Sequence, residues 1–166
     1  MTVRPIVRFP DVRLRTPAAQ ITVFDAALSA LAGDLLDTLR AAPGIGITGP
    51  HVGALVRLVV IELTPQDGVR IYVNPQVVSA SAERVRHAEG SVSMPGVSEE
   101  VERPAQVRIA YQDLAGTPRE ADADGLLAVC LQHEIDQLDG VFWLQRLSRL
   151  KRERVVKRYE KLHSVV

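Results

Sequence analysis

The sequence predicts an α+β fold in which antiparallel sheets surround a central helix, with a further helix at the C-terminal end. Helical periodicity appears once near the N-terminus and twice near the C-terminus, while the β-rich runs are grouped between them. Grouped strands followed by helices favour this class over alternating βαβ units. With 166 residues, 46 % of them hydrophobic, and no repeat or linker, the chain is expected to form a single domain, residues 1–166.

The first helix is predicted from apolar residues that recur at spacings of three and four. These residues are Phe24, Leu28, Leu31, Leu35 and Leu39. Acidic and basic residues between them complete an amphipathic pattern. The glycines and prolines of residues 43–53 end this helix, and so many glycines suggest a close approach of the backbone to another group.

Four runs rich in Val, Ile or Tyr are predicted to be strands, mostly antiparallel. They cover residues 55–63, 70–74, 83–88 and 106–113. A central helix is predicted over residues 124–139, with Gly140 as its C-terminal cap and apolar residues on several of its faces. Ser148 is the expected N-cap of a last helix over residues 148–163.

Composition excludes several classes of protein. The formal net charge is zero, so global charge gives no argument for nucleic acid or membrane as a partner. No stretch approaches the 18 or so apolar residues of a membrane span, and the N-terminus alternates arginine and proline where a signal peptide would be apolar. A single cysteine, Cys130, forms no internal disulfide and favours the cytosol.

One short motif lies in the central helix. His133 and Gln137 are four residues apart and project from the same face, with Glu134 beside them. In metallohydrolases with an H-E-x-x-H arrangement two histidines bind a metal and the Glu acts as general base. Here the second histidine is Gln137, and a lone His-Glu pair is more often a hydrogen-bonded histidine beside a surface carboxylate.

Three segments together resemble bacterial peptide deformylases. Residues 44–53, GIGITGPHVG, resemble the family's first motif, G-φ-G-φ-A-A-x-Q, where φ is apolar. Residues 89–96, EGSVSMPG, resemble the second motif, E-G-C-L-S, and residues 132–140, QHEIDQLDG, resemble the third, Q-H-E-x-D-H. The order and spacing agree over almost the whole chain, from Val7 to Leu162.

The resemblance implies a cytosolic hydrolase that removes formyl from N-formylmethionyl peptides. It also implies a divalent metal, ferrous iron in the family, at the positions of Ser91, His133 and Gln137, where the family has one Cys and two His. Glu134 matches the family's catalytic acid and base. Ile45, Gly46 and Val92 match residues that line the substrate pocket, and with His51 and Ser91 they form the predicted substrate-binding set.

This sequence departs from the family at the metal. Only His133 of the three ligand positions is retained, and His51 replaces the family's substrate-polarising Gln. One hypothesis is a rebuilt site in which His51 and His133 hold zinc or iron, completed by Ser91, Gln137 or Glu134 and water. A second is an empty pocket, without a metal, across which His51 and Gln137 hydrogen-bond each other.

Two further alternatives concern single residues. Ser91 could act as a nucleophile activated by His133, with Glu134 or Asp136 orienting the imidazole. Cys130 could replace the lost thiolate, but it is better interpreted as a small core hydrophobe. Met94 and Trp143 are expected in the core, and neither Asp136 nor Asp139 is assigned to catalysis.

The predicted C-terminal helix is strongly basic. Residues 146–161 hold eight basic and two acidic side chains, a net charge of +6 in a neutral chain. In the bacterial deformylases that this chain resembles, such a helix contacts the ribosome, whereas a solvated face is the ordinary interpretation. Two functions are therefore expected as alternatives: a deformylase-like hydrolase, or a non-catalytic module that binds peptide N-termini or the ribosome surface.

Overall fold

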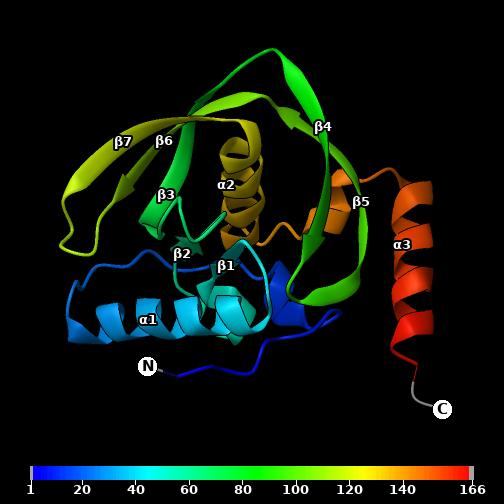
Figure 1. The fold of residues 1–166 in the computed structure, drawn as a ribbon, viewed down its shortest axis with the longest axis horizontal. Helices are drawn as coiled ribbons and strands as arrows, with labels where there is room; N and C mark the ends of the chain where they lie inside the picture. Colours follow the sequence, from blue (N-terminus) through cyan, green and yellow to red (C-terminus); the bar gives the residue numbers. More distant parts are fainter. Residues whose placement is uncertain (1, 165–166) are drawn as a thin grey trace.

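A computed structural model describes residues 2–164 and arranges them in two antiparallel sheets with three α-helices (Figure 1). The larger sheet has the order β1-β2-β3-β6-β7 and the smaller is the pair β4-β5. The larger sheet consists of β1 (Gly46–Thr48), β2 (Leu58–Ile61), β3 (Arg70–Ala80), β6 (Gln106–Gln112) and β7 (Pro118–Asp124). The pair consists of β4 (Arg84–Ser91) and β5 (Met94–Pro104). The predicted α+β fold is confirmed.

Helix α1 (Ala26–Ala41) packs against β1 and β2 through the apolar face that the sequence predicts. The side chain of Asp25 caps its N-terminus by accepting a hydrogen bond from the Leu28 backbone N–H at 3.1 Å. Leu35 and Leu39 are buried under the sheet, among the apolar residues of β2. The opposite face of α1 is solvated, so this helix covers one side of the larger sheet.

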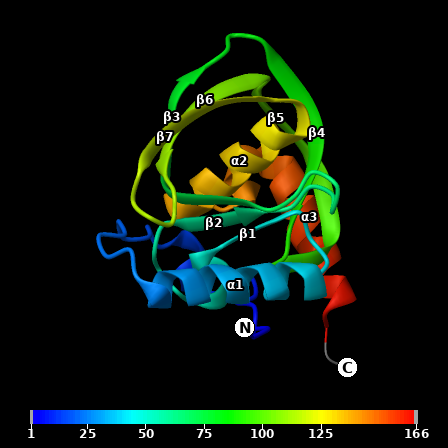
Figure 2. The same ribbon diagram turned by 60° about the vertical axis from the view of Figure 1, so that its left-hand side comes forward.

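Helix α2 (Gly125–Leu138) lies between the larger sheet and the β4–β5 pair (Figures 1 and 2). Its buried residues extend around most of its circumference, as the crowded apolar pattern predicts. Gly140 follows it with φ at 79°, and a Cβ there would stand 2.9 Å from the carbonyl oxygen of Arg15. Glycine therefore ends this helix, and the predicted cap is confirmed.

Helix α3 (Arg149–Leu162) runs along the outer side of β5 (Figure 1). Ser148 is its N-cap, as predicted, and accepts a hydrogen bond from the Lys151 backbone N–H at 3.3 Å. Met94 and Trp143 are buried in the core beneath it, which confirms their predicted role. Three short 3-10 helices complete the described chain: η1 (Val12–Arg15), η2 (Gly49–Val52) and η3 (Trp143–Arg146).

The strand predictions need correction. Strand β2 is shorter than the predicted 55–63, β3 continues to Ala80, and β4 continues to Ser91. Strands β1, β5 and β7 are absent from the prediction. β5 and β7 are rich in proline and acidic residues, which are unfavourable in strands, and β1 is only three residues long and begins with glycine. Each helix within residues 2–164 is too short or too polar to cross a membrane.

Candidate active site

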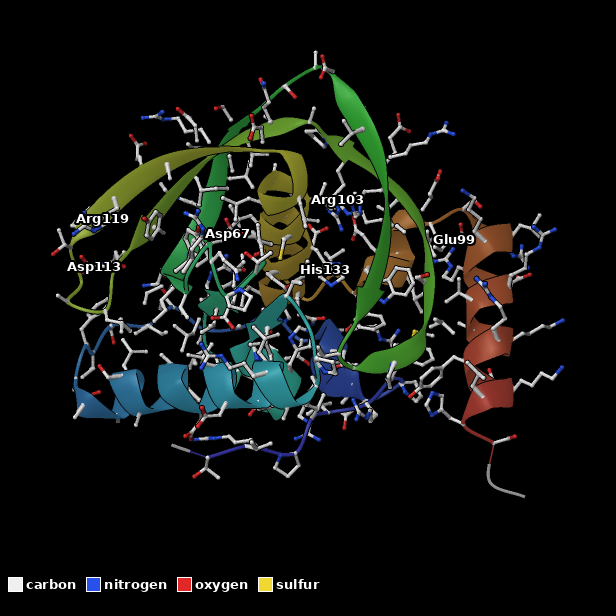
Figure 3. The ribbon with its side chains drawn as sticks, viewed as in Figure 1. Asp67, Glu99, Arg103, Asp113, Arg119 and His133 are labelled. Carbon is white, nitrogen blue, oxygen red and sulfur yellow. The ribbon has the colours of Figure 1, made fainter. Side chains whose placement is uncertain are left out.

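Residues from the three sequence motifs line one open cavity of about 400 Å³. The motif residues in its wall are Ile45, Gly46, His51, Ser91, Val92, His133 and Glu134. They come from β1 and the residue before it, from η2, from the β4–β5 turn and from α2. Figure 3 shows His133 on the side of α2 that faces β4. The structure thus brings together the predicted site residues except Gln137, which does not line the cavity.

Gly46 allows β1 to lie directly on α2. A Cβ at this position would stand 2.5 Å from Oε2 of Glu134 and 2.8 Å from Sγ of Cys130. Contacts this short are not tolerated, so only glycine fits here while both side chains stay in place. Cys130 is buried in the core cluster of the larger sheet, as expected of a small core residue, and it also lines the cavity.

His51 is almost fully buried, at 1 % exposure, and its Nδ1 also lies 3.0 Å from the hydroxyl oxygen of Thr48. Its Nδ1 accepts a hydrogen bond from the Thr48 backbone N–H at 3.0 Å. A backbone amide can only donate, so Nδ1 carries no proton and the proton of the neutral ring is on Nε2. Burial, and then the charge of His133, lower the pKa of His51 to about 3, so the ring is neutral at physiological pH.

The other ring nitrogen of His51 has no partner. Within residues 2–164, its buried Nε2 makes no hydrogen bond. The N–H at this atom is therefore a buried donor without an acceptor among the described residues.

His133 is held by a buried network of charges. Its Nδ1 donates to Oε1 of Glu89 at 2.8 Å. Arg103 binds both oxygens of Glu89, at 2.6 and 2.9 Å, and also donates to Oδ2 of Asp136 at 2.9 Å. Figure 3 shows Arg103 and His133 between α2 and the β4–β5 pair. The network fixes the imidazole plane and leaves Nε2 of His133 for the cavity.

Charge in this network sets the protonation of its members. Burial alone would raise the pKa of Glu89, but the hydrogen bonds from His133 and Arg103 outweigh it and lower that pKa to about 2. Burial disfavours charge on His133 as well, yet the negative Glu134 and the hydrogen bond to Glu89 raise its pKa overall. Glu89 is consequently an anion throughout the physiological pH range.

Glu134 is buried without a strong partner. Its Oε2 has only the Sγ of Cys130 nearby, at 4.0 Å, and Oε1 has no hydrogen-bond partner within residues 2–164. Burial raises the pKa of Glu134 to about 6, although His133 partly opposes this. Glu134 therefore has a buried acceptor atom without a hydrogen bond in the described residues, and its side chain lines the cavity beside His51 and His133.

The three family metal positions do not present the donors that a divalent metal needs. Ser91 offers a hydroxyl, which accepts a hydrogen bond from the Ser93 backbone N–H at 3.1 Å. Gln137 donates from its amide nitrogen to the carbonyl oxygen of Leu14 at 2.7 Å. Across residues 2–164, no three His, Cys, Asp or Glu side chains are placed to hold a metal ion. The side chains present do not fit a divalent metal.

Two of the sequence hypotheses are wrong in their contacts. His51 and Gln137 do not bond each other, because His51 binds Thr48 and Gln137 binds Leu14. The imidazole of His133 is oriented by Glu89, not by Glu134 or Asp136. Asp136 instead pairs with Arg103 and Arg146, and Asp139 pairs with Arg57 at 2.7 Å, so both serve ion pairs, in line with their exclusion from catalysis.

Glu89 and Arg103 were not identified from the sequence. Glu89 opens the second motif, which marks it as worth attention, but its partner His133 is 44 residues away. Arg103 lies in a run of charged residues that is typical of a solvent-exposed strand. Only the pairing of β4 with β5, which sets Val85 opposite Arg103, brings this arginine inward beside Glu89.

Comparison with known proteins places the chain in a family. A sequence model described as polypeptide deformylase matches residues 3–153. A "peptide deformylase-like" protein of Brucella melitensis is 64 % identical over 162 residues, which cover 98 % of this chain and 99 % of the relative. A peptide deformylase of Brucella suis is 42 % identical over 167 residues, covering 99 % and 95 %.

Comparison with solved structures gives the same family. The crystal structure of a peptide deformylase from Legionella pneumophila superposes with a TM-score of 0.92 at 36 % identity, covering 97 % of this chain and 95 % of that one. The peptide deformylase from Ehrlichia chaffeensis, solved in complex with actinonin, has a TM-score of 0.91 at 32 % identity, covering 99 % and 100 %. The chain therefore belongs to the polypeptide deformylase family.

Proposed function

We propose that this deformylase-like protein binds N-formylated or otherwise N-acylated peptide ends and does not hydrolyse them by metal catalysis. The observation that carries the proposal is the cavity in which residues of all three motifs meet. A cavity of about 400 Å³ accommodates an acylated residue and part of the next one. Peptide deformylases from Synechococcus elongatus and Ehrlichia chaffeensis were crystallised in complex with actinonin, which supports a ligand site in this fold.

Strand β1 offers a backbone edge for the peptide. It is the outermost strand of the larger sheet, so one of its sides is unpaired. The Ile45 carbonyl oxygen accepts from Glu62 N–H at 2.9 Å, on the β2 side. Backbone direction alternates along a strand, so the N–H and C=O of Gly46 point to the open side, beside the cavity. An extended peptide pairing there would direct its N-terminal group towards His51 and Glu134.

The same geometry argues against hydrolysis. The family generally uses a metal ion, and a metal lowers the pKa of bound water from about 15.7 to about 7. In this chain the donors at the metal positions are a hydroxyl, an imidazole and an amide already bonded to Leu14. Glu134 alone, with a pKa of about 6, is too weak a base to replace that effect.

Calorimetric titration tests the proposal with a formyl-methionyl tripeptide and the same tripeptide carrying a free amine. Formate release and the metal content of anaerobically purified protein are measured on the same sample. We expect binding of the formylated peptide, weaker binding of the free amine, no formate and substoichiometric metal. Turnover accompanied by stoichiometric metal would establish a hydrolase instead, and the absence of peptide binding would also refute the proposal.

The basic face of α3 supports a second contact, with phosphate groups such as those of the ribosome surface. Arg154, Lys157 and Lys161 are exposed along this helix, away from the cavity. Phosphate contacts of this kind weaken steeply with salt. Co-sedimentation with ribosomes at increasing salt, repeated with Arg154→Glu and Lys157→Glu together, should show a loss of affinity and a shallower salt slope. The cytosol is the compartment in which both contacts are available.

A further inference from the structure

We infer that residues 7–9 form a strap that holds two walls of the cavity together, with Arg8 as the positioning residue. The two walls are η2, which carries His51, and the β4–β5 turn, which consists of Val92 and Ser93. His51 and Val92 both line the cavity. The inference rests on the proposed function, because it names a segment outside the cavity that sets the affinity for the bound peptide.

The backbone of the strap bonds one residue of each wall. The Val7 N–H donates to the His51 carbonyl oxygen at 2.8 Å. Two residues later, the Phe9 N–H donates to the Ser93 carbonyl oxygen at 2.9 Å. Within residues 2–164, no backbone hydrogen bond joins η2 directly to the β4–β5 turn. Figure 1 shows the N-terminal segment, in dark blue, passing from beneath α1 to the end of the β4–β5 pair, so the strap is the backbone link between these two walls.

Arg8 holds the turn through its side chain. Its guanidinium donates to the Val92 carbonyl oxygen, so the carbonyls of both turn residues are directed at the strap. A hydrogen bond from a charged donor is stronger than one between neutral groups. Because Arg8 is exposed, its replacement leaves no cavity in the core, and its effect on the turn can be measured in a folded protein.

Phe9 anchors the strap to the interior. Its ring stacks on that of Phe142, with the centroids 5.8 Å apart, and packs edge to face with Tyr159 of α3 at 5.9 Å. Phe142 is buried in the core cluster beneath α3. The strap is therefore fixed to the core on one side and to the cavity walls on the other.

Val92 is restrained from two directions. Its side chain packs on the first motif, since a Cβ at Gly44 would stand 2.9 Å from Cγ1 of Val92. Its carbonyl is held by Arg8. A wall that the ligand must order lowers the affinity by the cost of that ordering, whereas a wall that is already in place does not. Arg8 therefore favours peptide binding without touching the peptide.

Two variants of Arg8 test this role with the formyl-methionyl tripeptide in calorimetry. Arg8→Ala removes the donor to Val92, whereas Arg8→Lys keeps a charged donor. Relative to wild type, affinity should fall about tenfold in Arg8→Ala and stay within about threefold in Arg8→Lys. The matched control is Arg4→Ala, which removes a 2.8 Å bond to Asp34, a residue that does not line the cavity, and should leave the affinity unchanged. Equal affinities of Arg8→Ala and Arg4→Ala would overturn the inference.

Hydrogen exchange of backbone amides tests the strap without a peptide. The Val7 and Phe9 amides should be protected in wild type, and the Phe9 amide should exchange at least about tenfold faster in Arg8→Ala. The Arg4 amide, which binds the Thr38 hydroxyl at 2.9 Å, should keep its exchange rate. Unchanged exchange of the Phe9 amide in Arg8→Ala would overturn the inference. If no acylated peptide binds to wild type, the proposed function fails, and the exchange rates still decide whether Arg8 holds the turn.

Discussion

Replacing Glu89 by Gln should destabilise the protein strongly, because this carboxylate joins Arg103 and His133 in the interior. The three side chains are 4 %, 5 % and 10 % exposed. Their hydrogen bonds, against the opposing effect of burial, lower the Glu89 pKa from 4.5 to about 2. That lowering corresponds to about 3 kcal/mol of folding free energy at neutral pH.

The pH dependence follows from the same pKa. Since the folded pKa of Glu89 is depressed, its contribution is complete above the unfolded value of 4.5 and is lost as the pH falls towards about 2. Between pH 7 and pH 3 the difference in stability between wild type and Glu89→Gln should shrink by about 2 kcal/mol. This stability difference is measured by urea denaturation at both pH values, with circular dichroism as the probe of unfolding.

The matched control is Glu120→Gln, which breaks an exposed pair with Arg108 at 3.1 Å. Because both side chains are about half exposed, this change should cost less than about 1 kcal/mol. Equal losses for Glu89→Gln and Glu120→Gln at pH 7 would refute the reasoning. A Glu89→Gln deficit that stays constant down to pH 3 would also refute it, because protonation of Glu89 would then not be the cause.

Three further predictions address the cavity. Gly46→Ala places a Cβ 2.5 Å from Glu134 Oε2 and 2.8 Å from Cys130 Sγ. Peptide affinity, measured by calorimetry, should fall about tenfold, and denaturation should show a stability loss of about 1–3 kcal/mol. Wild-type affinity would contradict this prediction. Glu134→Gln should be more stable than wild type by about 2 kcal/mol at pH 7, because folding raises the pKa of Glu134 from 4.5 to about 6. This gain in stability should vanish below about pH 4.5. A variant that is less stable than wild type in urea denaturation at pH 7 would contradict the prediction. The double variant Ser91→Cys, Gln137→His should bind close to one zinc per chain, as measured by elemental mass spectrometry. A double variant without metal would show that these two positions do not determine metal binding.

The helices were predictable because their signals are local. Ser148 caps α3 and Gly140 ends α2, and each acts within one turn of its own position. Strand β7 shows the opposite case. Its sequence from Pro118 to Asp124 has little strand preference, and it is a strand because it pairs along its length with β6.

The site was predictable in membership but not in contacts. Motif positions brought His51, His133 and Glu134 to one cavity. Which atom each ring nitrogen binds depends on neighbours that the spacing does not reveal, such as the Thr48 amide and the Glu89 carboxylate. Those contacts decide the chemistry, since they fix a proton on Nε2 of His51 and leave Nε2 of His133 free for the cavity.

Gln137 and His51, the two positions at which the sequence is expected to depart from the family motifs, both make hydrogen bonds within the fold. Gln137 ties α2 to η1 through the Leu14 carbonyl, and His51 ties its ring to Thr48. Each bond contributes about 1 kcal/mol, and each is lost if the residue turns to hold a metal. A metal held by these two side chains must therefore break hydrogen bonds that they already make. Ser91→Cys alone should therefore leave the protein metal-free, because Gln137 still binds the Leu14 carbonyl, whereas Ser91→Cys with Gln137→His should bind zinc.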